Sequence, residues 1–136
     1  MVTSNDCFAK YGAAEDQKFM KLYDLDVDIH AVPKRVYCNV DMIKPLRTAL
    51  NFIKNRGLSN ELKTWDGVFC IRKKRGSRSY SLHSWGIAVD VNAFENGMGA
   101  KPKLSEGFVK CFKDAGFEWG GDWKLPDGMH FQLSKI

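Results

Sequence analysis

With 136 residues, the chain has room for one domain with its own hydrophobic core, and 44% hydrophobic and 27% charged residues are ordinary for a globular protein. No apolar run approaches the roughly 20 residues of a membrane-spanning helix, which argues against a transmembrane protein. The net charge of +5 suits an anionic partner, such as nucleic acid, a membrane surface or a carboxylate-rich polymer, without choosing among them.

The first residues and the cysteines bear on where the protein is made. The start, MVTSNDCFAKYG, lacks the basic and apolar segments of a secretory signal, so we expect synthesis in the cytoplasm. The four cysteines are scattered and form no C-x-x-C pair, which argues against a cysteine zinc site and predicts reduced thiols. No repeat or linker interrupts the chain, so we predict a single domain over residues 1–136 and a monomer.

Apolar residues at helical spacing predict two helices, and residues 1–40 before them are predicted to be irregular. The first helix begins at Asp41, which can cap it, and Gly57 closes it. The second begins at Ser105, has its apolar residues on one face, and ends at Gly116.

Three short segments, 68–72, 87–92 and 129–133, have the composition or the alternation of β-strands. Together with the two helices they predict an α+β fold. In this fold a small antiparallel sheet has helices packed on one side, and its other face stays open for a functional site.

Two of the three histidines and one aspartate are candidates for a shared site on that open face. Alternation along the strands puts Asp90 and His130 opposite the apolar side chains of their strands. A carboxylate in an apolar strand costs on the order of several kcal/mol unless it has a partner. If the two strands are neighbours, both side chains emerge on one concave surface, which His83 can join. Two imidazoles and a carboxylate suit a catalytic zinc, Zn²⁺ with an open position for water.

Asp127 lies three residues before His130 in PDGMH, a predicted turn. A carboxylate there can take a proton from zinc-activated water and pass it to a leaving amine. A single histidine is more often structural, which is our interpretation of His30, because nothing near it forms a site. Ser81 and Ser84 lie in no G-x-S-x-G turn, so we expect Ser81 to support its loop by hydrogen bonding.

The stretch SLHSWGIAVD resembles the S-x-H-x-x-G-x-A-x-D motif of the M15 peptidases, zinc enzymes that cut peptidoglycan stem peptides. GFEWGGDW and DGMHFQL resemble the closing W-G-x-D-W and D-x-x-H segments of that family, so the resemblance runs from Val68 to the C-terminus. It implies that His83, Asp90 and His130 are the zinc ligands and that Asp127 is the catalytic base. Many family members have glutamate at this last position, and aspartate there is similar to the phage L-alanyl-D-glutamate endopeptidases.

The resemblance also suggests residues that contact the substrate. Arg72 resembles the family arginine before the histidine motif, and its guanidinium would hold the scissile carbonyl oxygen or a stem-peptide carboxylate. Arg78, in the same RKKRGSRS cluster, is the alternative. Ser81, Trp85 and Trp123 flank the motif residues and are candidates for binding substrate, although packing is the default role of a tryptophan.

The sequence therefore predicts a zinc metallopeptidase that acts on the stem peptide of bacterial peptidoglycan, as a phage endolysin of the L-alanyl-D-glutamate endopeptidase type. Such a protein would reach the cell wall after release through a separate membrane pore, such as a phage holin. One alternative is a D-alanyl-D-alanine carboxypeptidase, and a second is a non-catalytic zinc-containing cell-wall binding module. A third, nucleic-acid binding by the basic loop, lacks an accompanying recognition pattern, so we expect neither nucleic-acid binding nor membrane insertion.

Overall fold

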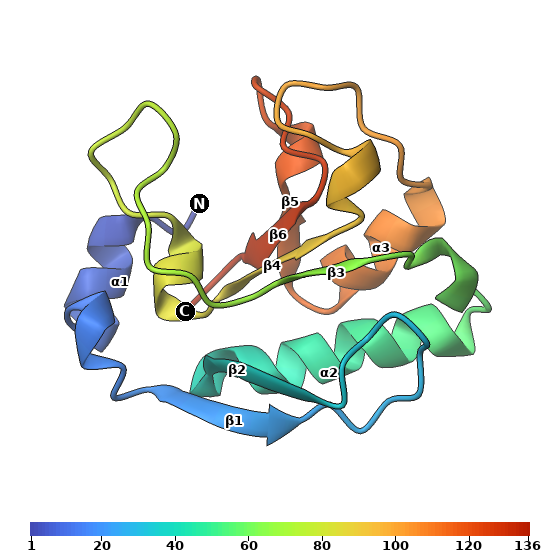
Figure 1. Ribbon diagram of the computed structural model, residues 1–136, viewed down its shortest axis with the longest axis horizontal. Coiled ribbons are helices and arrows are strands. Elements are labelled where there is room, and N and C mark those ends of the chain that lie inside the picture. Colours follow the sequence, from blue (N-terminus) through green and yellow to red (C-terminus); the bar gives the residue numbers. More distant parts are fainter.

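The computed structural model describes residues 1–136 and has an α+β fold built on a four-stranded antiparallel sheet (Figure 1). The strands of this sheet lie in the order β3–β4–β6–β5, and β1 and β2 form a separate antiparallel ribbon. The strands are Met20–Asp24 (β1), Arg35–Asn39 (β2), Trp65–Gly67 (β3), Ala88–Val91 (β4), Phe117–Trp119 (β5) and His130–Leu133 (β6). The α-helices are Ser4–Tyr11 (α1), Val40–Asn55 (α2) and Glu106–Asp114 (α3). None of them combines the length and apolar character needed to cross a membrane.

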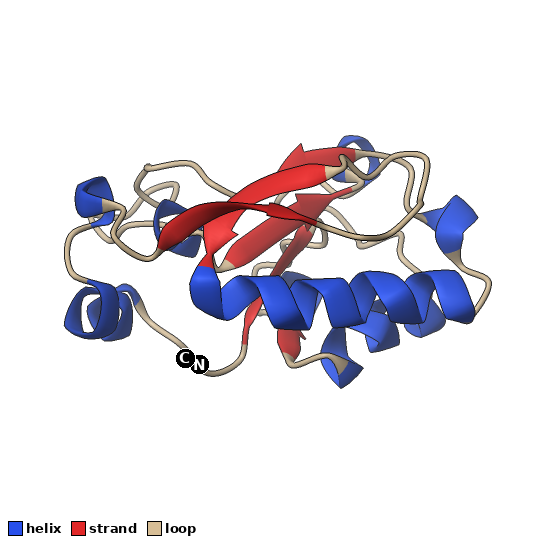
Figure 2. Ribbon diagram, turned by 90° about the horizontal axis from the view of Figure 1, so that it is seen from below, coloured by secondary structure: helices blue, strands red, loops and turns tan.

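The helices α2 and α3 lie together against one face of the sheet, as expected from the sequence (Figure 2). Phe112 of α3 stacks on Phe131 of β6 with ring centroids 4.0 Å apart, so α3 covers the apolar face of β6. The neighbouring side chain on that strand, His130, therefore points to the opposite face. In Figure 1 the segments after β3 and before β6 rise on that opposite side, away from α2.

The two predicted helices are confirmed, with one change at a cap. The N-cap of α2 is Asn39, whose side-chain oxygen accepts from the backbone N–H of Asp41 at 2.9 Å, and Asp41 lies in the first turn. Gly57, with a φ of +74°, follows the C-cap. The N-cap of α3 is Ser105, as predicted, and its hydroxyl accepts from the N–H of Phe108 at 3.1 Å.

Two other expectations from the sequence are wrong. Residues 1–40 are not irregular, since they form α1 and the β1–β2 ribbon. The strand expected at 68–72 lies earlier, as β3, because Val68 turns into the core while residues 70–72 are exposed and pair with no strand. The strands expected at 87–92 and 129–133 are confirmed to within one residue at each end.

Candidate metal centre

The pairing of β4 with β6 explains why an apolar strand contains a carboxylate. Asp90 and His130 are direct partners in the register of these antiparallel strands. Nδ1 of His130 lies 3.2 Å from Oδ1 of Asp90. Both side chains are largely withdrawn from solvent, with 15% of Asp90 and 8% of His130 exposed. The buried acid therefore has an imidazole partner across the strands, as the alternation predicted.

His83 reaches the same carboxylate from a single-turn 3₁₀ helix, η3 (Leu82–Trp85). The hydroxyl of Ser81 caps this turn by accepting from the N–H of His83 at 3.3 Å. Nδ1 of His83 donates to the carbonyl oxygen of Val68 at 2.7 Å. Nε2 lies 3.1 Å from Oδ1 of Asp90, yet this buried atom makes no hydrogen bond.

The N-terminal part of the chain holds η3 in place. The side-chain amide of Asn39 donates to the carbonyl oxygen of Trp85 at 3.0 Å, and the Trp85 indole N–H donates to the carbonyl oxygen of Gly12 at 2.9 Å. Gly86 ends the turn with a φ of +67°, and a Cβ there would lie 2.9 Å from the backbone nitrogen of Asn39. The β1–β2 ribbon and α1 thus set the position of His83.

The three side chains fit a divalent cation. One ligand atom from each of His83, Asp90 and His130 lies within 4.8 Å of the others. Because a carbonyl oxygen can only accept, the bond to Val68 fixes the proton of His83 on Nδ1 and leaves the lone pair of Nε2 for a ligand. Burial would raise the pKa of Asp90, but the neighbouring side chains of His130 and His83 outweigh burial and hold that pKa below its usual range. Two imidazole nitrogens and an ionised carboxylate form a donor set suited to zinc.

Asp127 lies beside this cluster on the turn before β6. Its backbone N–H donates to the carbonyl oxygen of Gly120 at 2.8 Å, and its own carbonyl oxygen accepts from the N–H of His130 at 3.1 Å. A Cβ at Gly120 would collide with the backbone of Asp127, so this glycine allows the turn to pack closely. Oδ1 of Asp127 is buried and has no hydrogen-bond partner. Burial raises the pKa of Asp127, and His130 acts in the opposite direction.

A cavity of about 450 Å³ opens onto Asp127 and His130. Three of the residues expected to contact substrate line it, namely Arg72, Ser81 and Trp123. The ring centroid of Trp123 lies 5.3 Å from that of His130.

The other two candidates for substrate contact lie elsewhere. Trp85 is a correction to the sequence prediction, because its ring is 2% exposed and packs against Phe8, with centroids 4.8 Å apart, between α1 and η3. Arg78 is exposed and does not line the cavity. The exposed His30 lies outside the cluster, which agrees with its expected lack of a role in the site.

The cavity wall is strongly basic. Arg72, Lys74 and Arg75 line it from the loop before η3, Lys124 lines it from the loop before β6, and Asp127 is its one acid. None of these four cations takes part in an ion pair. Unpaired positive charge around a cavity favours an anionic ligand such as a peptide carboxylate.

Comparison with known proteins agrees with this site. Residues 75–133 match the M15 peptidase family model described as D-alanyl-D-alanine carboxypeptidase. This segment of the chain is therefore similar to the M15 peptidases. The matched segment includes all three candidate ligands and Asp127, whereas Arg72 precedes it. One solved structure similar to this chain is the L-Ala D-Glu endopeptidase ChiX of Serratia marcescens, with a TM-score of 0.43 and 24% sequence identity, covering 71% of this chain and 80% of that chain.

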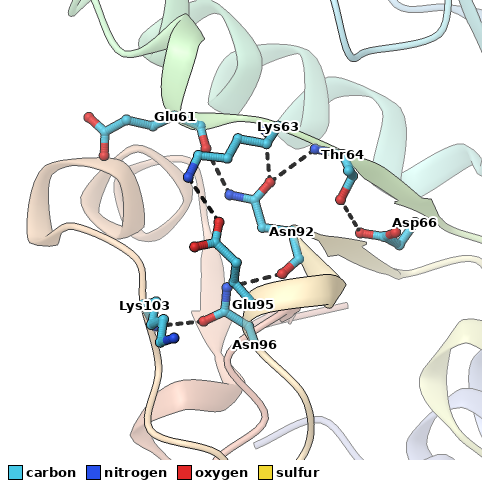
Figure 3. Close-up of polar contacts among 8 residues, drawn as sticks. All are labelled: Glu61, Lys63, Thr64, Asp66, Asn92, Glu95, Asn96 and Lys103. Carbon is cyan, nitrogen blue, oxygen red and sulfur yellow. Dashed lines mark hydrogen bonds and ion pairs between the residues drawn. The ribbon is translucent and has the colours of Figure 1, made fainter.

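The sequence did not reveal a buried asparagine network that supports the site (Figure 3). The side-chain oxygen of Asn92, directly after β4, accepts from the N–H groups of Lys63 and Thr64 at 2.8 and 3.1 Å. Asn96 donates to the carbonyl oxygen of Asn92 at 3.0 Å and accepts from the N–H of Lys103 at 2.7 Å. These bonds tie the end of the strand that carries the acid to the segment before β3 and to the loop before α3. Two asparagines at i and i+4 directly after an apolar strand were the available signal.

Proposed function

We propose that this chain hydrolyses a peptide bond in the stem peptide of bacterial peptidoglycan, with a zinc ion held by His83, Asp90 and His130. One observation carries the proposal: three ligand atoms converge within 4.8 Å, beside a buried carboxylate oxygen of Asp127 that has no partner. A structural zinc site has no need for such a carboxylate, because its coordination is closed. The match of residues 75–133 to the M15 family model supports the substrate class.

The chemistry supplied by zinc held there is that of a Lewis acid, which polarises a carbonyl group and makes a water molecule more acidic. Asp127 takes the proton of the attacking water on its free oxygen and passes it to the departing amine. The raised pKa of this buried carboxyl brings it closer to the pH at which it works. Arg72, on the wall of the same cavity, holds the scissile carbonyl oxygen as charge develops, or a carboxylate of the substrate.

Within this class we propose the L-alanyl-D-glutamate endopeptidase type, which is supported by aspartate at position 127. The second candidate is a D-alanyl-D-alanine carboxypeptidase, which is favoured by the description of the matched family. Digestion of a defined muropeptide separates the two. Mass spectrometry would show release of the intact peptide behind L-alanine for the endopeptidase, and release of a single terminal D-alanine for the carboxypeptidase.

The basic wall supports a substrate that carries carboxylates. Replacing Lys74 and Arg75 by glutamine should raise KM for a muropeptide and leave kcat nearly unchanged, because charges at the rim attract the substrate without taking part in the reaction. Lys21→Gln makes the same kind of charge change on the distant β1–β2 ribbon and should leave KM unchanged. Equal KM values for all these variants would show that the basic wall does not contribute to substrate binding.

The test of the catalytic assignment compares two aspartates on either side of the same turn. Asp127→Asn should keep bound zinc and lose about 10²–10⁴ in kcat, the usual contribution of a general acid–base group. Asp122→Asn is the control, since Asp122 is exposed and pairs with Lys113 at 2.6 Å. The assay counts new amino groups released from purified peptidoglycan, with and without a chelator. An active Asp127→Asn protein would refute the role, and full zinc occupancy in His83→Ala would refute the ligand set.

Two further candidate functions predict different experimental results. A non-catalytic zinc-containing cell-wall module would bind peptidoglycan without releasing amino groups. A nucleic-acid binder would show salt-sensitive binding of DNA that a chelator does not change.

We further propose that the protein is a monomeric phage endolysin, made in the cytoplasm and released to the cell wall through a separate pore. One chain supplies the three ligands and Asp127, so the site needs no second copy. Expression inside a bacterium should leave the cells intact until the inner membrane is permeabilised, and should then lyse them. Lysis before permeabilisation would contradict this route.

A further inference from the structure

The nitrogen of His130 that points away from Asp90 also has a partner. Nε2 of His130 lies 3.0 Å from Oε1 of Gln132, which is two residues along β6 and therefore on the same face of the strand. Gln132 is only 3% exposed, although it contributes to the wall of the cavity. A buried amide keeps its hydrogen bonds because each unsatisfied group would cost about 1–3 kcal/mol.

A third residue decides which way this amide points. Nε2 of Gln132 donates to Oε1 of Glu118 at 2.8 Å, and Glu118 is the direct partner of Gln132 across β5 and β6. An ionised carboxylate can only accept, so it binds the NH₂ end of the amide. The carbonyl end of Gln132 must then face His130. Because that carbonyl oxygen can only accept, Nε2 of His130 must be the nitrogen that bears a hydrogen.

We propose that Glu118 and Gln132 are positioning residues that make His130 a ligand through Nδ1. The inference rests on the metal site of the proposed function. Nδ1 of His130 is the nitrogen that faces Asp90, whereas His83 faces Asp90 with Nε2. The two histidines therefore offer different ring nitrogens to one ion. Neither Glu118 nor Gln132 is a ligand in this arrangement, and both hold the ring of His130 from behind. Gln132 also lines the cavity beside His130, whereas Glu118 does not.

A measurement of zinc affinity tests this relay, by which we mean the hydrogen bonds from Glu118 through Gln132 to His130, without any substrate. Residues that hold a ligand from behind typically contribute 10–100-fold to metal affinity, so Gln132→Leu should weaken zinc binding by about that factor. The probe is Zn²⁺ alone, titrated into purified protein against a chelating dye. Ser134→Ala is the control, since the Ser134 hydroxyl donates to the carbonyl oxygen of Gly116 at 2.8 Å near the same strand pair but away from the histidine. Unchanged affinity in Gln132→Leu would overturn the proposal.

An exchange of the two partners separates positioning from general destabilisation of the strand pair. Gln132→Glu alone places two carboxylates against each other and should weaken zinc binding. The double variant Glu118→Gln with Gln132→Glu restores the order of donors and acceptors, because the new amide donates to the new carboxylate and that carboxylate accepts from His130. Zinc affinity should therefore return in the double variant. Failure to recover it would count against the relay.

Nitrogen-15 NMR of the histidine rings gives a readout in the unaltered chain, which remains available if a variant does not fold. In the zinc-loaded protein, His130 should show a hydrogen on Nε2 and ligation through Nδ1, and His83 should show the opposite arrangement. Ligation of His130 through Nε2 would overturn the proposal, while the peptidase function proposed above would still stand on its own assay.

Discussion

The two histidines of the candidate metal centre are both proposed ligands, but different kinds of backbone structure hold them in place. His83 lies on the single turn η3, and the carbonyl oxygen of Val68 fixes its ring. His130 lies within β6, where the ladder fixes the backbone and two side chains fix the ring. A ligand in a regular strand thus has its backbone held by ladder hydrogen bonds to the neighbouring strands, here β4 and β5. A ligand on a short turn depends on distant parts of the chain, here the first 40 residues, to hold its backbone.

The largest expected effect comes from the glycine that ends the turn of His83. Gly86→Ala has to keep a left-handed backbone, which costs about 1–2 kcal/mol, and its Cβ would crowd the backbone nitrogen of Asn39, which adds about 1–3 kcal/mol. Gly57→Ala is the control, because its φ of +74° carries the same strain with no atom within 4 Å of the new Cβ. Urea unfolding should show a larger loss of stability for Gly86→Ala, and zinc titration should show weaker binding in that variant alone. Equal losses in the two variants would mean that η3 is not clamped by the ribbon.

The second prediction separates the two roles of Asn39, which caps α2 and donates to the carbonyl oxygen of Trp85. Asn39→Ala should cost about 1–3 kcal/mol, since it removes a helix cap and leaves a buried carbonyl group unpaired. Ser105→Ala removes only the cap of α3 and should cost about 1 kcal/mol. Zinc affinity should fall in Asn39→Ala and stay unchanged in Ser105→Ala. If both variants bind zinc equally well, the bond to Trp85 does not position His83.

The third prediction compares two tryptophans that each donate an indole N–H to a glycine carbonyl oxygen. Trp85 donates to Gly12 at 2.9 Å beside η3, and Trp119 donates to Gly128 at 2.8 Å beside Asp127. Replacement of either by phenylalanine keeps most of the packing and should cost about 1 kcal/mol for the lost hydrogen bond. Trp85→Phe should act mainly on zinc affinity, and Trp119→Phe mainly on kcat, because Gly128 adjoins the proposed base. The reverse pattern would show that the two supports do not act separately.

A similar contrast, between elements with a clear sequence periodicity and elements stabilised by distant residues, explains how much of the fold could be predicted. The helices α2 and α3 have a buried apolar face and a capping residue, and their sequence periodicity reports both. The ribbon β1–β2 packs at the surface, so most side chains of β1 are exposed or only half-buried and give no apolar alternation. Of the eight residues of α1, only Cys7 and Tyr11 are buried. Such elements are stabilised by contacts with distant residues, which a local pattern does not contain.

The site divides in a similar way. Asp90 and His130 were predictable because alternation and a family motif both selected them, and the motif also selected His83. Gln132 stood in the sequence as a polar residue on the same strand face as His130, but its bond to Glu118 depends on the pairing of β5 with β6. Asn39 gave a signal only for a helix cap. Its second bond crosses 46 positions of the chain and could not be predicted.

The smallest expected effect is a difference in reactivity between buried thiols of the two regions, Cys7 in α1 and Cys111 in α3. Burial raises the pKa of the Cys7 thiol to about 12 and also raises that of Cys111, and both side chains are fully buried, so neither reacts near pH 8 until its surroundings open. Cys70 is exposed and should react with a thiol reagent first. Cys7 should follow well before Cys111, because α1 is a two-turn helix with only two buried residues, whereas α3 lies between α2 and β5. Mass spectrometry of peptides from timed labelling would give each rate. Equal rates for Cys7 and Cys111 would mean that the support of His83 opens only together with the support of His130, so that the two form one cooperative unit.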